Sequence, residues 1–484
     1  MPAVVFILGL AIFAMTTSEF MVAGMLPQLS AGLGVSISAI GYLVSAYAVA
    51  MALGGPIISA ATTRVSRARV LVALLAAFLV GQVLAAVATG YPMLLLSRLV
   101  SGAAEAAFLG VGLTLAMDIV GPRLVGRASS VLLGGLMISS VLGVPLATLL
   151  AQWAGWRGSF WAVAGMVLVA GLAVLRTLRR PVTGGSTGPG NSSGPADPGS
   201  RTGAAPGGLR AELAPFRDRR LWAVYATGML QVGSLFAAAS YFAAIFIGRT
   251  GFAPELVPAL LTGYGVAAVI GNVIVGRLAD RFPIAVLTVG LGAQAVLLAG
   301  FAAGSRVPTV ALVTVLGVGL VGLPLNSATI ARRLRVAPNR PLVNSVGASM
   351  VNVGIAIGPT LGGLAISAGL GLTAPLWIGA ALAGLGLLSL APYLRRARPA
   401  VPTGGENVTR GRVSPYSPAP TITWSPGSFD AAVAPDGTAP IRRPDSAQRH
   451  QPVETLRSFA LGMAFLYRTL KMLLDAARRR ATGF

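Results

Sequence analysis

The segment GPIISAATTRVSRARVL (residues 55–71) has a counterpart 216 residues further along the chain, GNVIVGRLADRFPIAVL (residues 271–287). The two segments align without a gap, and in each an arginine-containing turn joins two apolar stretches. Repeated halves are typical of secondary transporters, in which a central site is exposed to each side of the membrane in turn. The repeat therefore predicts two related halves around a central cavity.

Hydropathy extends this pattern over most of the chain. Of the 484 residues, 55% are apolar and 11% are charged, and the mean hydropathy is +0.77. Soluble domains carry about 25% charged residues. Apolar stretches of the length that a bilayer core requires recur along the sequence. We predict an all-α membrane protein with twelve transmembrane helices in two six-helix pseudo-repeats, near residues 3–26, 39–61, 70–90, 93–117, 128–152, 158–175, 222–247, 256–276, 284–303, 307–329, 344–369 and 373–394.

Composition then divides the chain into four parts. We predict an N-terminal six-helix bundle (1–180), a flexible cytoplasmic linker (181–220), a C-terminal six-helix bundle (221–398) and a disordered cytoplasmic tail (399–484). From 181 to 208, 14 of 28 residues are Gly or Pro, a composition that cannot pack a core. Near 453–480, apolar residues recur at helical spacing between basic residues, which favours a basic amphipathic helix on the membrane surface; a partner-binding helix and an out-of-frame sequence from GC-rich DNA are the alternatives.

Arginine is unequally distributed between the two sides of the predicted bundle. The loops of one side contain nineteen arginines, whereas those of the other contain three, Arg157, Arg249 and Arg306. By the positive-inside rule, both termini are expected in the cytoplasm. The net charge of +23 therefore reflects membrane topology, and we expect no nucleic-acid partner.

Composition also excludes several kinds of site. The chain has no Cys, and its single His, His450, lies in the polar tail, so a thiolate site, a histidine zinc site and a histidine triad are excluded. Lys471 follows Leu470, whereas a Walker A loop places Gly before Lys. The segment GVGLVG (317–322) matches GxGxxG but has no preceding strand. We expect no enzymatic activity, no cofactor and no metal.

Three charged residues lie inside the predicted spans. Glu19 lies in TTSEFMVAG (16–24), ~24 Å from the cytoplasmic end of its helix, and Arg98 lies ~8 Å from the outer end of the fourth span, at comparable depth. Glu105 follows Arg98 by seven residues, on the same helical face. Burial favours a neutral carboxyl and a nearby arginine favours an ionised one. We therefore interpret the three as proton-coupling or substrate-binding residues, with helix packing as the alternative.

Glycine and proline mark candidate hinges in corresponding spans of the two halves. Gly143 and Pro145 interrupt the fifth predicted span, and Gly358 and Pro359 interrupt the eleventh. Such residues permit bending or close approach, so gating and static packing are both open. Aromatic and polar residues in the spans are candidates for lining the cavity: Phe13, Phe108, Gln231, Phe236, Tyr241 and Asn352.

Several motifs resemble the major facilitator superfamily. GRLADR (276–281) resembles its cytoplasmic loop motif Gly-x-x-x-Asp-Arg, which implies that Gly276, Asp280 and Arg281 control conformation. LSRLVSGAAEAAF (96–108) and LLGGLMISSVLGVPLA (132–147) resemble motifs of the twelve-helix drug:proton antiporter branch. TTSEFMVAGMLPQL (16–29) and AGWRGSFWAV (154–163) look closest to actinobacterial chloramphenicol-resistance exporters. The resemblance covers about residues 2–395.

Two departures from the family pattern fall inside this region. The first-half loop AATTR (60–64) lacks the Gly and Asp of the motif, which shifts the expected gating role to the second half. Glu105 stands where close relatives often carry a neutral residue.

Residues and resemblance together predict proton-coupled efflux of small amphipathic drugs by alternating access, with chloramphenicol-type antibiotics implied by the resemblance. Export of sugars or nucleobases by the same superfamily is the alternative. An alternative of another class is a membrane sensor or scaffold that works through its basic tail. We expect a monomer in the bacterial inner membrane, with a small-molecule substrate, protons and the lipid bilayer as its partners.

Overall fold

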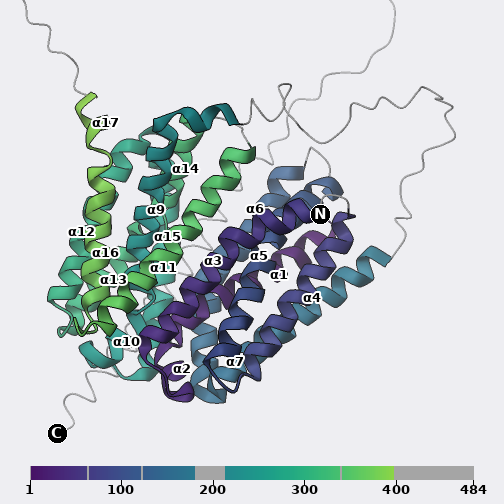
Figure 1. Cartoon of the computed structure of the whole chain (residues 1–484), viewed down its shortest axis with the longest axis horizontal. Helices are drawn as coiled ribbons and strands as arrows, with labels where there is room; N and C mark the ends of the chain where they lie inside the picture. The colour runs from purple at the N-terminus through teal and green to yellow at the C-terminus, as the bar shows by residue number, and fades with distance from the viewer. Residues whose placement is uncertain (1, 63–64, 121–123, 180–212, 338–340, 397–484) are drawn as a thin grey trace, which may run out of the picture. The chain divides into compact units, whose positions relative to one another are not determined.

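The computed structural model describes residues 2–62, 65–120, 124–179, 213–337 and 341–396, which lie within one compact unit of residues 1–402 (Figure 1). The described residues form helices joined by turns and contain no strand. A helix satisfies its backbone hydrogen bonds within its own segment, as lipid requires of a spanning element. The prediction of an all-α membrane fold is confirmed.

The first half begins with α1 (Ala3–Gly24), and the short α2 (Leu26–Leu33) joins it to the next spanning helix. Gly34 ends α2 in the left-handed region, with φ of 63°, and Ser36 Oγ caps the next helix by accepting the Ala39 N–H at 3.2 Å. The remaining elements of this half are α3 (Ile37–Ala61), α4 (Arg67–Ala86), α5 (Tyr91–Val120), α6 (Val125–Ile138), the π-helical η2 (Ser139–Gly143) and α7 (Val144–Arg179).

The second half opens with a short 3-10 turn, η3 (Ala214–Arg217), and Asp218, whose Oδ1 accepts the Arg220 N–H at 2.8 Å and caps the first long helix. The elements that follow are α9 (Arg219–Ala239), α10 (Phe242–Ile245), η4 (Phe246–Thr250), η5 (Pro254–Leu256), α11 (Val257–Arg281), α12 (Pro283–Ala303), α13 (Pro308–Val321), α14 (Leu325–Val336), α15 (Pro341–Ser367), α16 (Ala374–Leu388) and α17 (Ala391–Arg396). Proline at the start of α12, α13 and α16 suits a first turn, where no N–H partner is needed.

Eleven helical segments of the described chain are long and apolar enough to cross a membrane. One of them, Val125–Thr177, has 53 residues, more than twice what a bilayer requires. It is divided by Gly155, whose φ of 73° and ψ of 163° are not helical. The segment therefore makes two crossings, so the described residues contain twelve, six in each half.

The predicted linker ends earlier than residue 220. Residues 214–217 form η3, and Trp222 Nε1 donates to the Phe216 carbonyl at 2.9 Å, so this part packs on the start of α9. The charged residues Arg219 and Arg220, assigned to the linker by their polarity, form the first turn of that helix. Residues 181–212, the tail 399–484 and its predicted amphipathic helix lie outside the described residues.

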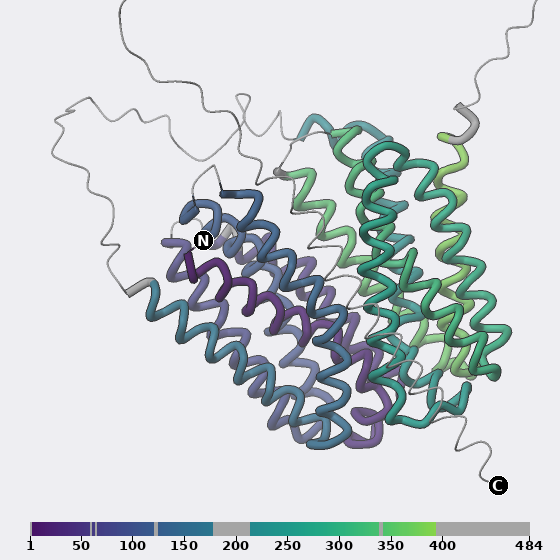
Figure 2. Tube along the Cα trace, turned by 180° about the vertical axis from the view of Figure 1, so that it is seen from behind, coloured from purple at the N-terminus to yellow at the C-terminus, as the bar shows by residue number. Residues whose placement is uncertain are grey.

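The two halves meet mainly along α3 and α15, which lie side by side (Figures 1 and 2). Thr360 Oγ1 donates to Ser45 Oγ at 2.9 Å, and Ser349 Oγ donates to the Ala52 carbonyl at 3.3 Å. A second contact joins Gln152 Nε2 to the Pro254 carbonyl at 2.6 Å. Hydrogen bonds and close packing thus hold the halves together within this unit.

Candidate functional site

A cluster of buried polar side chains lies inside the first half. It contains Ser18 and Glu19 of α1, Tyr47 of α3, and Arg98 and Glu105 of α5, none of which is more than 9% exposed. Ionisable groups in the interior of a membrane bundle are functional-site candidates by default, because they are costly to place there. The structure therefore brings together all three charged residues that the sequence singled out.

Arg98 is fixed by the backbone of α1. Its Nη1 donates to the Ser18 carbonyl at 2.9 Å and to Ser18 Oγ at 3.2 Å, and its Nη2 donates to the Glu19 carbonyl at 3.0 Å. Its Cζ lies 3.9 Å from the centroid of the Tyr47 ring. The predicted common depth of Arg98 and Glu19 agrees with these contacts. The hydrogen bonds of Arg98 go to the main chain of Ser18 and Glu19, so in the described chain this arginine ties α5 to α1.

Glu105 joins three helices. Its Oε1 accepts a hydrogen bond from Thr16 Oγ1 of α1 at 3.2 Å, and its Oε2 accepts one from the Tyr47 hydroxyl of α3. Arg98 and Glu105 also share Tyr47 as a neighbour, as expected for residues two turns apart on one face. A change in the charge of Glu105 would therefore act on α1 and α3 together.

Sequence reasoning missed Gln82 of α4, which links this cluster to a fourth helix. Ser18 Oγ donates to Gln82 Oε1 at 3.1 Å, and Gln82 Nε2 donates to Ser101 Oγ at 3.1 Å. The polar amide of Gln82 in an otherwise apolar span could have indicated this link, and the hydroxyl of Tyr47 in α3 could have indicated the contact with Glu105. The cluster is thus a continuous polar network across α1, α3, α4 and α5.

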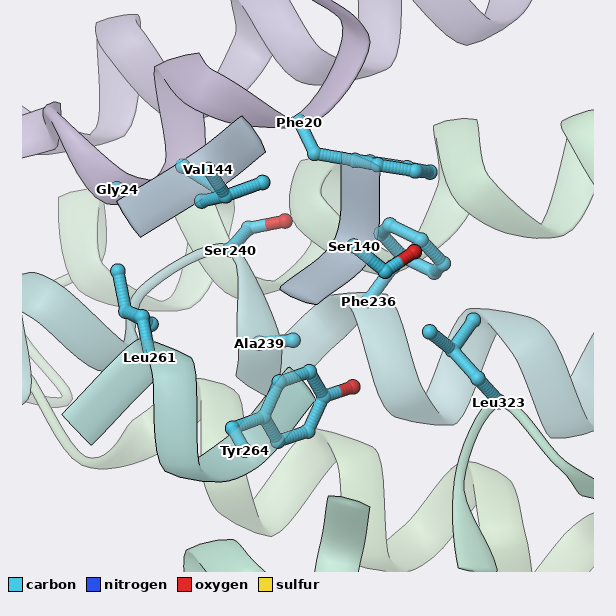
Figure 3. Close-up of a pocket in the computed structure, with 11 residues that line it drawn as sticks. Phe20, Gly24, Ser140, Val144, Phe236, Ala239, Ser240, Leu261, Tyr264 and Leu323 are labelled. Atoms are coloured by element: carbon cyan, nitrogen blue, oxygen red, sulfur yellow. The ribbon is translucent and has the colours of Figure 1, made fainter. Parts of the chain in front are cut away.

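A pocket of about 70 Å³ lies between the two halves, next to this cluster (Figure 3). Phe20 of α1 and Phe236 of α9 face it with ring centroids 5.7 Å apart. Three hydroxyl residues, Ser140, Ser240 and Tyr264, also line it, and the described lining contains no charged side chain. Ser240 is 1% exposed, and its Oγ has no hydrogen-bond partner among the described residues. The pocket therefore offers aromatic surface and a buried hydroxyl to a ligand.

The structure places the predicted cavity residues differently from one another. Phe236 lines the pocket, whereas Phe108 is fully buried in the core of the first half. Gln231 Nε2 donates to the Gly322 carbonyl at 2.7 Å and the Tyr241 hydroxyl to the Pro359 carbonyl at 2.8 Å, so both stabilise the second half. Phe13 and Asn352 are partly buried and do not line this pocket.

The two predicted helix breaks also differ. Gly143 ends the π-helical η2, Pro145 lies in the first turn of α7, and a Cβ on Gly143 would overlap Thr17 of α1. In the second half the predicted interruption is wrong, because α15 continues through Gly358 and Pro359. A Cβ on Gly358 would overlap the Gly233 carbonyl of α9, so this glycine permits close helix approach.

The loop-motif residues lie at the end of α11. Asp280 and Arg281 are exposed, and Arg335 Nη2 of α14 donates to their carbonyls at 2.6 and 3.2 Å. The Cζ atom of Arg281 also lies 5.3 Å from the centroid of the Phe282 ring. A Cβ on Gly276 would meet nothing within 4 Å. In this conformation the motif therefore braces the helix end through its main chain.

Known proteins match this arrangement over most of the chain. The sequence model of the Major Facilitator Superfamily matches residues 8–259 and 246–470. A chloramphenicol resistance protein of Streptomyces lividans is 34% identical over 397 residues, which cover 81% of this chain and 96% of the relative. The inner membrane transport protein YdhP of Escherichia coli is 32% identical and is covered to 93%, with 79% of this chain.

More distant similarities agree with the fold. A protein of Helicobacter acinonychis described as "Probable sugar efflux transporter" is 25% identical over 80% of this chain and 93% of its own length. The crystal structure of a bacterial homologue of the lysosomal transporter Spinster, in an inward-facing and unoccupied conformation, superposes with a TM-score of 0.62 at 16% identity, covering 82% of this chain and 96% of that one. The twelve crossings, the internal repeat and these matches show that the chain is a multi-pass transporter of the Major Facilitator Superfamily.

Proposed function

We propose that the chain exports small, neutral, amphipathic drugs in exchange for protons, with chloramphenicol-type antibiotics as the leading substrates. One observation carries the proposal: a buried acid cluster adjoins an apolar pocket between the halves. Glu19 belongs to the cluster through its main-chain bond with Arg98, and the next residue, Phe20, lines the pocket. A proton bound at the cluster and a drug bound in the pocket would therefore act on the same turn of α1.

The lining of the pocket supports a neutral substrate with an aromatic ring. Phe20 and Phe236 offer ring surfaces, and Ser240 offers a buried hydroxyl without a partner in the described chain. A chloramphenicol-type molecule combines an aromatic ring with hydroxyl and amide groups and carries no charge. The volume of about 70 Å³ is below the roughly 300 Å³ of small-ligand pockets. Binding would thus require the halves to move apart, as alternating access does.

The hydrogen bonds of Glu105 suggest how a proton drives that movement. Tyr47 of α3 donates to Glu105, and the same helix contacts the second half through Ser45 and Thr360. Protonation of Glu105 removes the negative charge that accepts hydrogen bonds from Tyr47 and Thr16. It would therefore change how α3 is bonded to α5, and α3 is the helix that contacts the second half. Inward proton movement supplies about 2.3 kcal/mol per charge for each 100 mV.

The positive-inside rule supports our further proposal that the protein lies in the cytoplasmic membrane with both termini inside. We propose that it acts as a monomer, since each six-helix half packs against the other within one chain. Sugar export is the second candidate, favoured by the similarity to a sugar efflux transporter. The largely apolar pocket fits an amphipathic drug better than a polyhydroxylated sugar, which needs many hydrogen-bond partners.

A drug-susceptibility panel in an efflux-deficient host tests the proposal. Expression should protect growth against chloramphenicol-type drugs, and a protonophore should abolish the protection. Protection that persists without residues 399–484 would argue against a sensor or scaffold that works through the tail. A host that gains no drug tolerance but exports labelled sugars would support the second candidate.

Transport in inverted vesicles tests the coupling role directly. Glu19→Gln keeps the size of the side chain and the main-chain bond to Arg98 but removes the titratable group. We expect proton-driven drug uptake to fall while drug binding persists. Undiminished uptake by this variant would sink the proposed role of Glu19.

A further inference from the structure

The second half contains a cationic cavity that the transport mechanism above does not use. Its volume is about 290 Å³, and it lies where α11 ends and α12 begins, at the end of the second half opposite α10 and η4. Three arginines line it: Arg220 of α9, and Arg332 and Arg335 of α14. No carboxylate occurs among its described lining residues, which are otherwise apolar or, in the case of Tyr393, aromatic.

Arg332 is buried in the wall of this cavity with part of its guanidinium unpaired. The residue is 4% exposed, its Nη1 donates to Thr227 Oγ1 at 3.1 Å, and its Cζ lies 4.5 Å from the centroid of the Tyr393 ring. Its buried Nη2 has no hydrogen-bond partner in the part of the chain that the structure describes. An unpaired buried guanidinium nitrogen is unfavourable, so this geometry calls for an acceptor.

The neighbouring groups add positive potential. Pro283 and Ile284 in the first turn of α12 line the cavity, and this 21-residue helix directs the positive end of its dipole there. Arg335 is held at the rim, because its Nη2 bonds to the last carbonyls of α11. Two acids adjoin these residues: Asp218 Oδ1 accepts the Arg220 N–H, and the exposed Asp280 contacts Arg335 through its main-chain carbonyl.

The first half shows what normally neutralises such a position. There Arg67, at the start of α4, forms an ion pair with Asp118 near the end of α5. In the repeat alignment, Arg67 corresponds to Pro283. The helix α14 ends the fourth crossing of the second half, as α5 does in the first half. At its end, α14 carries Arg332 and Arg335 and no acid. The end of α14 therefore carries positive charge without an acid of its own, whereas the end of α5 supplies Asp118.

We propose that the cavity binds a phosphate-bearing anion, which supplies the negative charge that Asp118 supplies in the first half. The phosphate belongs either to the headgroup of an anionic lipid or to free phosphate. Arginine is suited to this ligand, since its planar fork binds phosphate oxygens in pairs, and a helix N-terminus adds main-chain donors. The bound anion would join α9, α12 and α14 and stabilise the second half as a unit.

Thermal unfolding of the full-length protein in neutral detergent tests this site, with tryptophan fluorescence as the readout. The protein is titrated with short-chain phosphatidylglycerol, with phosphatidylcholine of the same chain length, and with inorganic phosphate. We expect phosphatidylglycerol or inorganic phosphate, but not phosphatidylcholine, to raise Tm. A rise with inorganic phosphate alone assigns the site to the free anion, and a rise that requires phosphatidylglycerol assigns it to the lipid.

Three variants make the test specific. Arg332→Gln and Arg220→Gln should each raise the half-saturating ligand concentration about ten- to a hundredfold, which is the loss of affinity expected for a charge-assisted hydrogen bond. Arg219→Gln is the matched control, because it removes the same charge from the adjacent exposed residue, which does not line the cavity. If Arg332→Gln does not fold, Arg220→Gln decides the question. Equal weakening by Arg219→Gln, or none by Arg220→Gln, would overturn the proposal, as would the absence of any rise in Tm.

Discussion

The interiors of the two halves are built alike but are filled with different chemistry. In the first half, α1 contacts the helices around it through Arg98, Glu105 and the amide of Gln82. In the second half, neutral amide and hydroxyl groups hold the middle of the corresponding first helix, α9, and the charged Arg332 reaches it at Thr227. Gln294 Nε2 of α12 donates to Ser234 Oγ at 2.8 Å and to the Gln231 carbonyl at 3.3 Å.

This difference separates two tasks that a symmetric repeat could have shared. The first-half network contains carboxyl groups that can gain or lose a proton, whereas the side-chain amides of the second half can only form or lose hydrogen bonds. Among the described residues of the second half, the buried charged side chain is that of Arg332, which lies near the end of α14 and does not line the pocket between the halves. Under the proposed function, the first half would bind the proton and the second half would supply the other wall of the pocket.

Of the changes considered, removal of Arg98 should have the largest effect, a loss of stability of the first half. Arg98→Ala leaves the main chain of Ser18 and Glu19 without its donors and leaves Glu105 without its nearby positive charge. Loss of one partner from a buried charged network costs about 3–5 kcal/mol. Denaturant unfolding in detergent measures this loss, with exposed Arg277→Ala as the control. Equal unfolding midpoints for the two variants would show that the network does not hold the first half together.

Glu105→Gln should separate stability from coupling. The amide keeps an acceptor for Thr16 or Tyr47 but carries no exchangeable charge. Loss of one coupled charge lowers the attainable drug gradient by roughly 50-fold per 100 mV, since that charge supplies about 2.3 kcal/mol. Vesicle uptake with and without an imposed potential measures the change. Exposed Glu255→Gln is the control and should retain the full gradient; a full gradient in Glu105→Gln as well would remove this residue from the coupling path.

The neutral network of the second half predicts the opposite pattern. Gln294→Leu removes hydrogen bonds to Ser234 and to the Gln231 carbonyl, at a cost of about 1 kcal/mol per bond. Unfolding should therefore become easier, while the dependence of transport on the proton gradient is retained. Transport assays across a series of imposed pH gradients check this. If proton dependence is lost in this variant, the division of tasks between the halves does not hold.

The smallest effect is expected in the pocket itself. Ser240→Ala removes a buried hydroxyl that has no partner in the described chain, so stability should be nearly unchanged. If that hydroxyl binds substrate, the half-saturating drug concentration should rise about two- to tenfold, as for one neutral hydrogen bond. Ser130→Ala, at an exposed position of α6, provides the control. Identical drug affinity in both variants would show that the substrate does not use Ser240.

The sequence predicted the spans well and the inward-facing side chains poorly. Hydropathy located the ends of the crossings to within seven residues, because lipid demands an apolar stretch of fixed length. It could not tell which residues face the cavity, since a membrane helix can be apolar on all sides. Phe108 was therefore predicted to line the cavity but lies in the core, while Phe20 and Tyr264 were missed.

Spacing was informative where both residues lie on one helix. Arg98 and Glu105, seven residues apart, do face the same neighbour. Tyr47, which connects them, is remote in sequence and could be found only from the packing of α3 on α5. For the same reason, neither the role of Gln82 nor the bonds from Arg98 to the main chain of α1 could be predicted from the sequence. Depth could be counted along a helix, but the atom that receives a hydrogen bond could not.

The turn at Gly155 has a consequence for how the protein is made. Its φ of 73° and ψ of 163° lie in a region that is essentially restricted to glycine, although a Cβ there would meet nothing within 4 Å. Glycine is thus required by the main chain and not by crowding. Because helical residues flank Gly155 on both sides, the fifth and sixth crossings follow each other without a loop, and we expect them to enter the bilayer as a helical hairpin. A β-branched residue at this position would have to adopt the same backbone conformation at a cost of about 1–3 kcal/mol, so the turn between the two crossings would be destabilised.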